Sequence, residues 1–191
     1  MGMTPAVAAA PVQSKTLTLY RRHLQTPIGP MLALASSDGL CALEFSGPRR
    51  LNRLEGRLSR WFPPHEIVDA PNAVLDLTHD WLSEYFGGVS AAIEGIPLDL
   101  RGAAFEQRVW RALREIPPGE TTSYGEIARR LGSPGAPRAV GLANGANPVA
   151  IIVPCHRVIG ANGSLVGYGG GLNRKTWLLD HERRWRQDAL F

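Results

Sequence analysis

The hydrophobic pattern of this chain changes halfway along its length, and the change limits the architectures open to it. Residues 17–46 contain three short apolar runs, separated by the turn signals at 26–30 and at Asp38-Gly39. They predict a small antiparallel sheet. Helical stretches over 51–61 and 75–86 follow, and each ends at a Pro or Gly pair.

The pattern becomes helical after residues 97–102. Phe105, Val109 and Leu113 recur at helical spacing, and Pro117-Pro118-Gly119 ends that helix. We therefore expect an α+β fold, with a small N-terminal antiparallel sheet and helices followed by a mostly helical C-terminal domain. The expected divisions are a disordered tail (1–16), an N-terminal support domain (17–100) and a C-terminal domain (101–191).

The location of the protein is predicted from what the chain of 191 residues contains. No apolar stretch approaches the roughly 20 residues that span a bilayer, and residues 1–16 lack the basic and apolar regions of a secretory signal. The two cysteines, Cys41 and Cys155, suggest no disulfide framework and fit a reducing compartment. We expect a cytoplasmic protein with no membrane association and no metal site.

Positive charge is concentrated in the second half of the chain. Residues 1–100 carry eight Lys and Arg against ten Asp and Glu, whereas residues 101–191 carry thirteen against seven. The excess of +6 in the second half indicates either a polyanionic partner or an ordinary solvated basic face.

A helix-turn-helix is predicted within this basic half. Ser123 and Glu126 have the spacing of a capping box, so a helix should begin at Tyr124, and Gly132 stands where that helix should end. After a turn over 133–136, the segment APRAVGLANGAN predicts the second helix. Its surface consists largely of Ala and Gly, from which Arg138 projects. Either close helix packing or close approach to a narrow DNA groove would explain such small residues.

A candidate nucleophile follows an apolar run over residues 149–153. Cys155 and His156 are adjacent, so their side chains diverge and a water would have to bridge them. A Cys-His dipeptide alone is weak support for catalysis. A glycine-rich loop over 160–171 and a helix over 173–186 come next. Glu182 on that helix either forms a surface ion pair with a nearby arginine or orients His156.

Five segments then carry a specific resemblance. TTSYGEIA, RAVGLANGANP, IIVPCHRVIG, GYGGG and KTWLLDHE, in this order and spacing, closely resemble the O6-alkylguanine-DNA alkyltransferases, the methylated-DNA–protein-cysteine methyltransferase family. The resemblance is strong over 102–182 and weaker over 17–99. It implies stoichiometric repair of O6-alkylguanine, and possible action on O4-alkylthymine, by transfer of the alkyl group to the protein itself.

The resemblance also assigns catalytic roles. Cys155 accepts the alkyl group, His156 is its base through a water, and Glu182 orients His156. Asn147 braces the turn that presents the cysteine. Tyr124 helps to rotate the target phosphate and donates a proton toward guanine N3.

Further roles concern DNA. The resemblance implies a double-stranded DNA partner that is bound through its minor groove. It also implies a monomer that needs no cofactor and that would lie at the nucleoid in a bacterium. Arg138 fills the gap left by the flipped base. Ala139 and Asn144, on the same helix, are expected to contact DNA.

The remaining roles concern the flipped guanine. The backbone carbonyls of Val158 and Cys155 would accept from its amino group, Tyr168 would pack along it, and Lys175 lies near the closing loop. Gly169 stands where some relatives have serine, so a contact to guanine O6 there must come from the backbone N–H. An N-terminal zinc site found in some relatives is not evident.

Three other functions are weighed against this one. An alkyltransferase-like lesion-binding protein would lack the acceptor cysteine, whereas Cys155 is present. A sequence-reading regulator would need base-reading side chains on the second helix, which has few. A cysteine hydrolase would need an oxyanion hole and a base that reaches the thiol directly, and neither is apparent.

Overall fold

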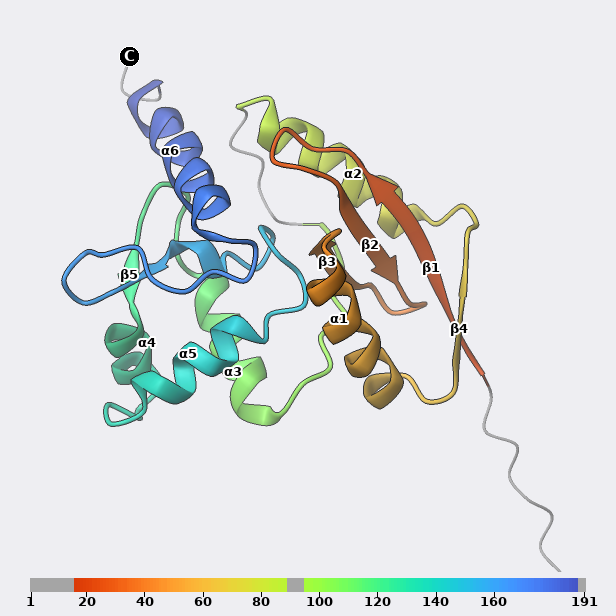
Figure 1. Cartoon of the computed structure of the whole chain (residues 1–191), viewed down its shortest axis with the longest axis horizontal. Coiled ribbons are helices and arrows are strands. Elements are labelled where there is room, and N and C mark those ends of the chain that lie inside the picture. Colours follow the sequence, from red (N-terminus) through yellow and green to blue (C-terminus); the bar gives the residue numbers. More distant parts are fainter. Residues whose placement is uncertain (1–15, 89–94, 189–191) are drawn as a thin grey trace, which may run out of the picture.

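A computed structural model describes residues 16–88 and 95–188, with side chains to Trp185 (Figure 1). The predicted disordered tail therefore lies, apart from Thr16, outside the described residues. The fold is α+β, as expected. Within the described ranges, no helix has the length and apolar character that a membrane crossing requires.

The N-terminal half is built on a four-stranded sheet in the order β3-β2-β1-β4. The predicted antiparallel strands are β1 (Leu17–Leu24), β2 (Met31–Ala35) and β3 (Leu40–Phe45). The sheet is nevertheless mixed, because β4 (His65–Val68) pairs in parallel with β1. This strand was missed because its four residues, HEIV, show no buried side chain and give no alternating pattern.

Two helices cover opposite faces of this sheet (Figure 1). Helix α1 (Pro48–Trp61) buries Leu54 and Leu58 against one face, and begins three residues before the predicted start with a proline in its first turn. Helix α2 (Ala73–Phe86) buries its apolar stripe against the other face. The Asn72 side chain caps α2 by accepting from the N–H groups of Val74 and Leu75.

The described part of the C-terminal half contains four α-helices and a two-stranded parallel sheet. The helices are α3 (Ala104–Arg114), α4 (Tyr124–Arg130), α5 (Pro137–Gly145) and α6 (Leu172–Asp188). The short strands β5 (Thr122–Ser123) and β6 (Val158–Ile159) pair in parallel and were not predicted. A single cluster of buried side chains runs through both halves, from Leu24 on β1 to Trp185 on α6.

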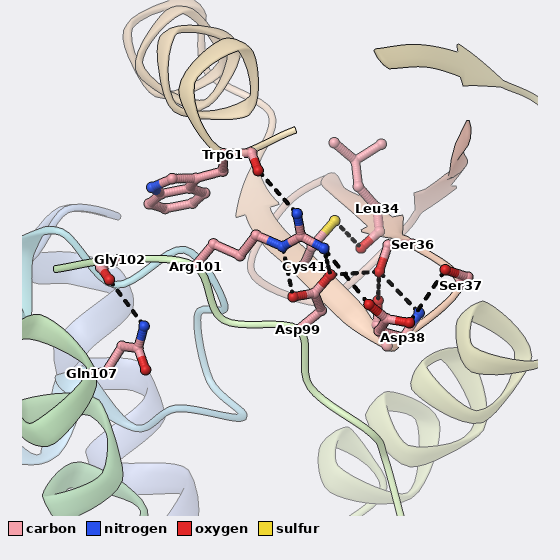
Figure 2. Close-up of polar contacts among 11 residues, drawn as sticks. Leu34, Ser36, Ser37, Asp38, Cys41, Trp61, Asp99, Arg101, Gly102 and Gln107 are labelled. Atoms are coloured by element: carbon pink, nitrogen blue, oxygen red, sulfur yellow. Dashed lines mark hydrogen bonds and ion pairs between the residues drawn. The ribbon is translucent and has the colours of Figure 1, made fainter. Parts of the chain in front are cut away.

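The connection between the halves is held by Arg101. Its guanidinium bonds Asp99 on both carboxylate oxygens at 3.0 and 3.1 Å and donates to the Trp61 carbonyl at 3.0 Å (Figure 2). Ser36 on the sheet side donates to Asp99 at 2.7 Å. These bonds fix the start of the C-terminal half to the end of α1 and to the end of β2.

Candidate active site

Cys155 is presented by a tight turn that Asn147 holds at both ends. The Asn147 amide donates to the Val153 carbonyl at 2.7 Å, and its oxygen accepts from the Val149 N–H at 3.0 Å. Inside the turn, Ile151 has φ 72°, an unfavourable conformation for a β-branched residue. The apolar run is therefore a compact turn, after which a 3₁₀ turn begins at Cys155.

The thiol faces a pocket of about 300 Å³ between the two halves of the chain. This volume is at the small end of ligand sites. The C-terminal half contributes Tyr124, α5 and the glycine-rich loop, and the N-terminal half contributes one end of β3 and one end of α1. The lining residues are Phe45, Arg50, Arg53, Tyr124, Gly141, Asn144, Gly145, Asn147, Ala150, Cys155, Gly167, Tyr168, Gly169 and Gly170.

His156 and Glu182 form a fully buried pair behind the cysteine. His156 Nε2 lies 2.8 Å from Glu182 Oε1, and both side chains have no exposed surface. If Nε2 carries the proton that binds this carboxylate, Nδ1 is left with a free lone pair. Nδ1 is buried and bonds no other atom of the described residues. The imidazole is thus fixed with a proton-accepting atom available.

The Glu182 carboxylate accepts five hydrogen bonds in all, so the surface ion pair considered from the sequence is wrong. Arg157 donates to both of its oxygens at 2.8 and 2.9 Å. The Tyr85 hydroxyl donates to Oε1 at 2.8 Å and the Gly119 N–H to Oε2 at 3.0 Å. Together with His156, these donors hold one buried carboxylate in one orientation.

Tyr85 and Arg157 are functional neighbours that the sequence analysis missed. Tyr85 lies on α2, which was read as structural support, and its ring stacks against Trp81 with centroids 5.1 Å apart. Arg157 is 1% exposed, which is rare for arginine unless it is paired. Its place directly after the Cys-His dipeptide was the one available signal.

The electrostatics leave the thiol protonated and the imidazole neutral at rest. Burial raises the pKa of Cys155, although a hydrogen bond from Asn147 opposes the shift. Burial likewise lowers the pKa of His156, against the pull of Glu182. Burial alone would raise the pKa of Glu182, but His156 and Arg157 hold it well below its usual range. A neutral imidazole can accept the thiol proton.

The glycine-rich loop packs over the site through Tyr168, and Lys175 of α6 holds the loop in place. The Tyr168 ring meets Phe45 and His156 edge-on, each with centroids 6.4 Å apart. Lys175 is buried and donates to the carbonyls of Val158 at 2.6 Å and Val166 at 2.7 Å. Lys175 therefore joins the loop to β6.

Gly169 lies directly against α1. A Cβ atom built at Gly169 would stand 1.9 Å from Arg50 Nη1. Arg50 is itself held by an ion pair with the buried Glu44. The position where some relatives carry serine is therefore occupied here by a guanidinium group of the N-terminal half.

The predicted helix-turn-helix is present as α4 and α5. Ser123 accepts from the Glu126 N–H at 3.1 Å and so caps α4 at Tyr124, while Gly132 takes the expected left-handed conformation with φ 70°. The Glu126 carboxylate pairs with arginines of its own helix instead of completing the capping box. Tyr124 lines the pocket, and burial raises its pKa.

The outer face of α5 bears Arg138 and Leu142, both exposed, with Ala139 half-buried beside them. Asn144 lies on the inner face, where it is 4% exposed and donates to the Cys155 carbonyl at 3.3 Å. The structure thus brings Asn144 to the nucleophile and leaves Arg138 and Ala139 outside the pocket lining.

Helix packing accounts for only part of the small-residue surface of α5. Ala143 is buried, and its carbonyl accepts from the Trp110 indole at 2.8 Å. In contrast, a Cβ at Gly145 would meet nothing within 4 Å, and one at Gly141 would meet only the Tyr124 ring at 3.8 Å. These two glycines border the pocket, so packing does not explain them.

Comparison with known proteins gives a consistent result for both halves. Residues 19–100 match the ribonuclease-like domain of 6-O-methylguanine DNA methyltransferase, and residues 104–184 match its DNA-binding domain. The methylated-DNA–protein-cysteine methyltransferase of Mycobacterium tuberculosis is 49% identical over 86% of this chain and 93% of its own length. That of Salmonella typhimurium is 44% identical over 87% and 96%.

Solved structures agree. The crystal structure of Mycobacterium tuberculosis OGT in complex with DNA aligns with a TM-score of 0.69 at 42% identity, covering 88% of this chain and 94% of that one. The O6-methylguanine-DNA methyltransferase of Pyrococcus kodakaraensis aligns with a TM-score of 0.65 at 25% identity, covering 86% and 98%. Matches to both domain models and extensive identity to these enzymes establish that the chain belongs to the 6-O-methylguanine DNA methyltransferase family.

Proposed function

We propose that the protein repairs DNA by transferring the alkyl group of O6-alkylguanine to the sulfur of Cys155, once per molecule. One observation carries this proposal: a cysteine lies at the wall of a pocket of about 300 Å³, next to a buried imidazole that a carboxylate holds in place. The relatives named methylated-DNA–protein-cysteine methyltransferase support the reaction.

The polar atoms around the pocket suit a flipped guanine. The Asn144 Oδ1, Tyr168 Oη and Arg50 Nε atoms are buried and bond nothing in the described residues. Each such atom costs about 1–3 kcal/mol unless a partner satisfies it. A base with donors and acceptors on its edge would supply partners, and the Cys155 and Val158 carbonyls would accept from its amino group. Tyr168 would lie along the base, and the Gly169 N–H would face its O6 atom.

The DNA would enter from the side of the helix-turn-helix. We infer that α5 sits in the minor groove, where its bare face at Gly141 and Gly145 allows close approach. The target atom cannot be reached inside the base stack, so the nucleotide must be rotated out. Arg138 is exposed and unpaired among the described residues, and it would occupy the vacated space. Ala139 would contact the groove, whereas Asn144 acts from inside the pocket wall.

The reaction needs one proton to leave the thiol and one to reach the departing guanine. We infer that the Cys155 proton passes through a water to His156 Nδ1 as sulfur attacks the alkyl carbon. The carbon–oxygen bond breaks, and Tyr124, kept protonated by its raised pKa, donates to guanine N3. The product is a thioether, which water does not cleave, so no turnover follows.

The halves of the chain would divide this work. Residues 101–191 would bind DNA and accept the alkyl group, whereas residues 17–100 would support the site through Tyr85, Phe45 and Arg50. We further infer that the protein acts as a monomer, because one chain contains every group of the site. We infer a location in the cytoplasm. If the source is a bacterium, like the sources of the two relatives, the protein would lie at the nucleoid.

The test is a count of repaired bases. A duplex with a single O6-methylguanine is incubated with limiting protein, and its nucleosides are quantified. We expect O6-methylguanine to convert to guanine in an amount equal to the protein, after which conversion stops. Unchanged DNA, or conversion of many bases per protein, would contradict the proposal. A parallel duplex with O4-methylthymine measures the range of substrates.

A further inference from the structure

Helix α1 carries five arginines, Arg49, Arg50, Arg53, Arg57 and Arg60, against one acidic residue, Glu55. Successive residues of an α-helix are rotated by about 100°, so these five positions fall within an arc of about 100°. Leu54 and Leu58 define the buried side of the helix, and the arginines lie beside it. They form one continuous row, which we call the α1 arginine row.

The charge of this row is unlike that of its surroundings. Outside α1, residues 17–100 contain two arginines and nine acidic residues. The negative average of the N-terminal half therefore hides a strongly basic helix. A row of like charges destabilises the free protein by self-repulsion, and a bound partner of opposite charge would relieve that repulsion.

Most of the α1 arginine row is without a protein partner. Arg50 pairs with Glu44, but Arg49, Arg53 and Arg60 are exposed and form no ion pair or hydrogen bond among the described residues. Arg57 is partly buried with its guanidinium 6.0 Å from the centre of the Trp61 ring. Burial and the charge of Arg50 lower its pKa. The guanidinium groups that solvent reaches are thus available for an anion.

The row begins at the reactive pocket and leads away from it. Arg50 and Arg53 line the pocket that holds Cys155. Arg57 and Arg60 line a second, open groove of about 590 Å³, which Arg101 also borders. One acidic side chain, Glu106, lies in that groove and bonds the Ala103 N–H. In Figure 1, α1 and α5 both lie in the lower half of the view, and both border the reactive pocket.

We propose that the α1 arginine row binds the phosphate backbone of the DNA that enters the pocket, as a second contact surface separate from the helix-turn-helix. The proposal rests on the function proposed above, since the flipped nucleotide fixes where the strand passes. From Arg49 to Arg60 the row spans about 16 Å. A DNA strand presents a phosphate about every 3.4 Å along its axis, so the row can face roughly four or five of them.

The test compares two double variants with equal loss of charge. Arg49→Gln/Arg60→Gln removes two exposed, unpaired arginines of the row that lie outside the Cys155 pocket. Arg21→Gln/Arg22→Gln removes two arginines of β1 that pair with Asp69 and Asp76. Binding to an unmodified duplex is measured by fluorescence anisotropy over a series of salt concentrations. Alkyl transfer from free O6-methylguanine base is measured on the same proteins.

The row variant should bind DNA about tenfold more weakly at low salt, and its plot of log affinity against log salt should be shallower by about 1.8, or 0.9 for each lost phosphate contact. Transfer from the free base should stay at the wild-type rate, which also reports an intact fold. The β1 variant should keep the wild-type slope. Equal slopes for the two variants would overturn the inference. A wild-type protein that accepts an alkyl group neither from the free base nor from DNA would instead overturn the proposed function.

Discussion

At the scale of single residues, the reactivity of Cys155 depends on groups that do not touch it. The thiol is buried with a raised pKa, so the resting protein does not hold a ready thiolate. Under the proposed function, deprotonation accompanies attack, and His156 is the proposed proton acceptor.

Cys41 provides the contrast. It lies on β3, where its thiol donates to the Leu34 carbonyl at 3.3 Å, and burial raises its pKa to about 12. In the described structure no imidazole bonds it. Cys41 is therefore a core residue of the sheet and a suitable control position for experiments on Cys155.

Tyr85→Phe tests the contribution of the N-terminal half to the reaction. The change removes the hydrogen bond that Tyr85 donates to Glu182 Oε1. Because His156 bonds the same oxygen, the carboxylate should then stabilise the imidazolium form of His156 more strongly. We expect transfer to slow about tenfold, or about 1.4 kcal/mol in activation free energy. The acid limb of the pH–rate profile should move to higher pH.

Stopped-flow or quench kinetics from pH 5 to 8 measure both effects. Tyr20→Phe on β1 is the control, because its hydroxyl bonds no protein group in the described residues. An unchanged profile in Tyr85→Phe would show that the carboxylate does not need this donor.

At the scale of elements, the long amphipathic segments were predictable and the short ones were not. Helices α2, α4, α5 and α6 begin within two residues of their predicted starts, because caps, prolines and spacing of apolar residues encode them locally. Strands β4, β5 and β6 have two to four residues and exist only through their partners. Their pairing is a tertiary effect that local patterns do not contain.

The site shows the same division between local and tertiary effects. Cys155, His156 and Glu182 could be placed together from their motifs. The contacts from Tyr85, Arg50 and Phe45 could not, because they cross from one half of the chain to the other. No local spacing reports which face of a distant helix reaches the pocket.

Gly141→Ala tests the meaning of the bare face of α5. Alanine in a helix interior is favoured over glycine by roughly 1 kcal/mol, and the added Cβ has ordinary space. We expect the variant to unfold at a higher temperature yet to react more slowly with damaged DNA. Gly56→Ala on α1, where a Cβ meets nothing within 4 Å, should gain stability without slower reaction. If both variants reacted with damaged DNA at equal rates, helix packing would be the better explanation for Gly141.

Gly169→Ala tests the contact between the loop and α1. The new Cβ would collide with the Arg50 guanidinium, so the loop or the arginine must move. We expect slower transfer and a lower free energy of unfolding. The double variant Gly169→Ala/Arg50→Ala should recover part of the lost transfer rate and part of the lost free energy of unfolding. Neighbouring residues of this kind couple by about 0.5–3 kcal/mol in a double-mutant cycle. Strictly additive effects would mean that the two residues do not meet.

At the scale of the whole molecule, a continuous core and a shared set of buried polar bonds join the two halves. Buried side chains from β1 to α6 belong to one cluster, and Tyr85 joins α2 to Glu182 on α6. The electrostatic cost of burying His156, Arg157 and Glu182 together is offset by their mutual bonds. Stability and reactivity should therefore share a pH dependence.

This shared dependence predicts the acid limb of stability. The folded-state pKa values of His156 and Glu182 lie below their ordinary values of 6.5 and 4.5. The unfolded chain consequently takes up protons first as the pH falls. The free energy of unfolding should decline below about pH 6.5 through His156, and further below about pH 4.5 through Glu182. Urea titrations at pH 7.5, 5.5 and 4 measure it, and constant stability down to pH 4 would contradict the assignment.

The most direct test of the account is the mass of the intact protein after reaction with a duplex that contains O6-methylguanine. We expect a gain of about 14 Da, one methyl group in place of one hydrogen, located on Cys155 by peptide mapping. Cys41→Ala should gain the same mass, and Cys155→Ala should gain none. A wild-type protein of unchanged mass, or a methyl group on any other residue, would contradict the central claim.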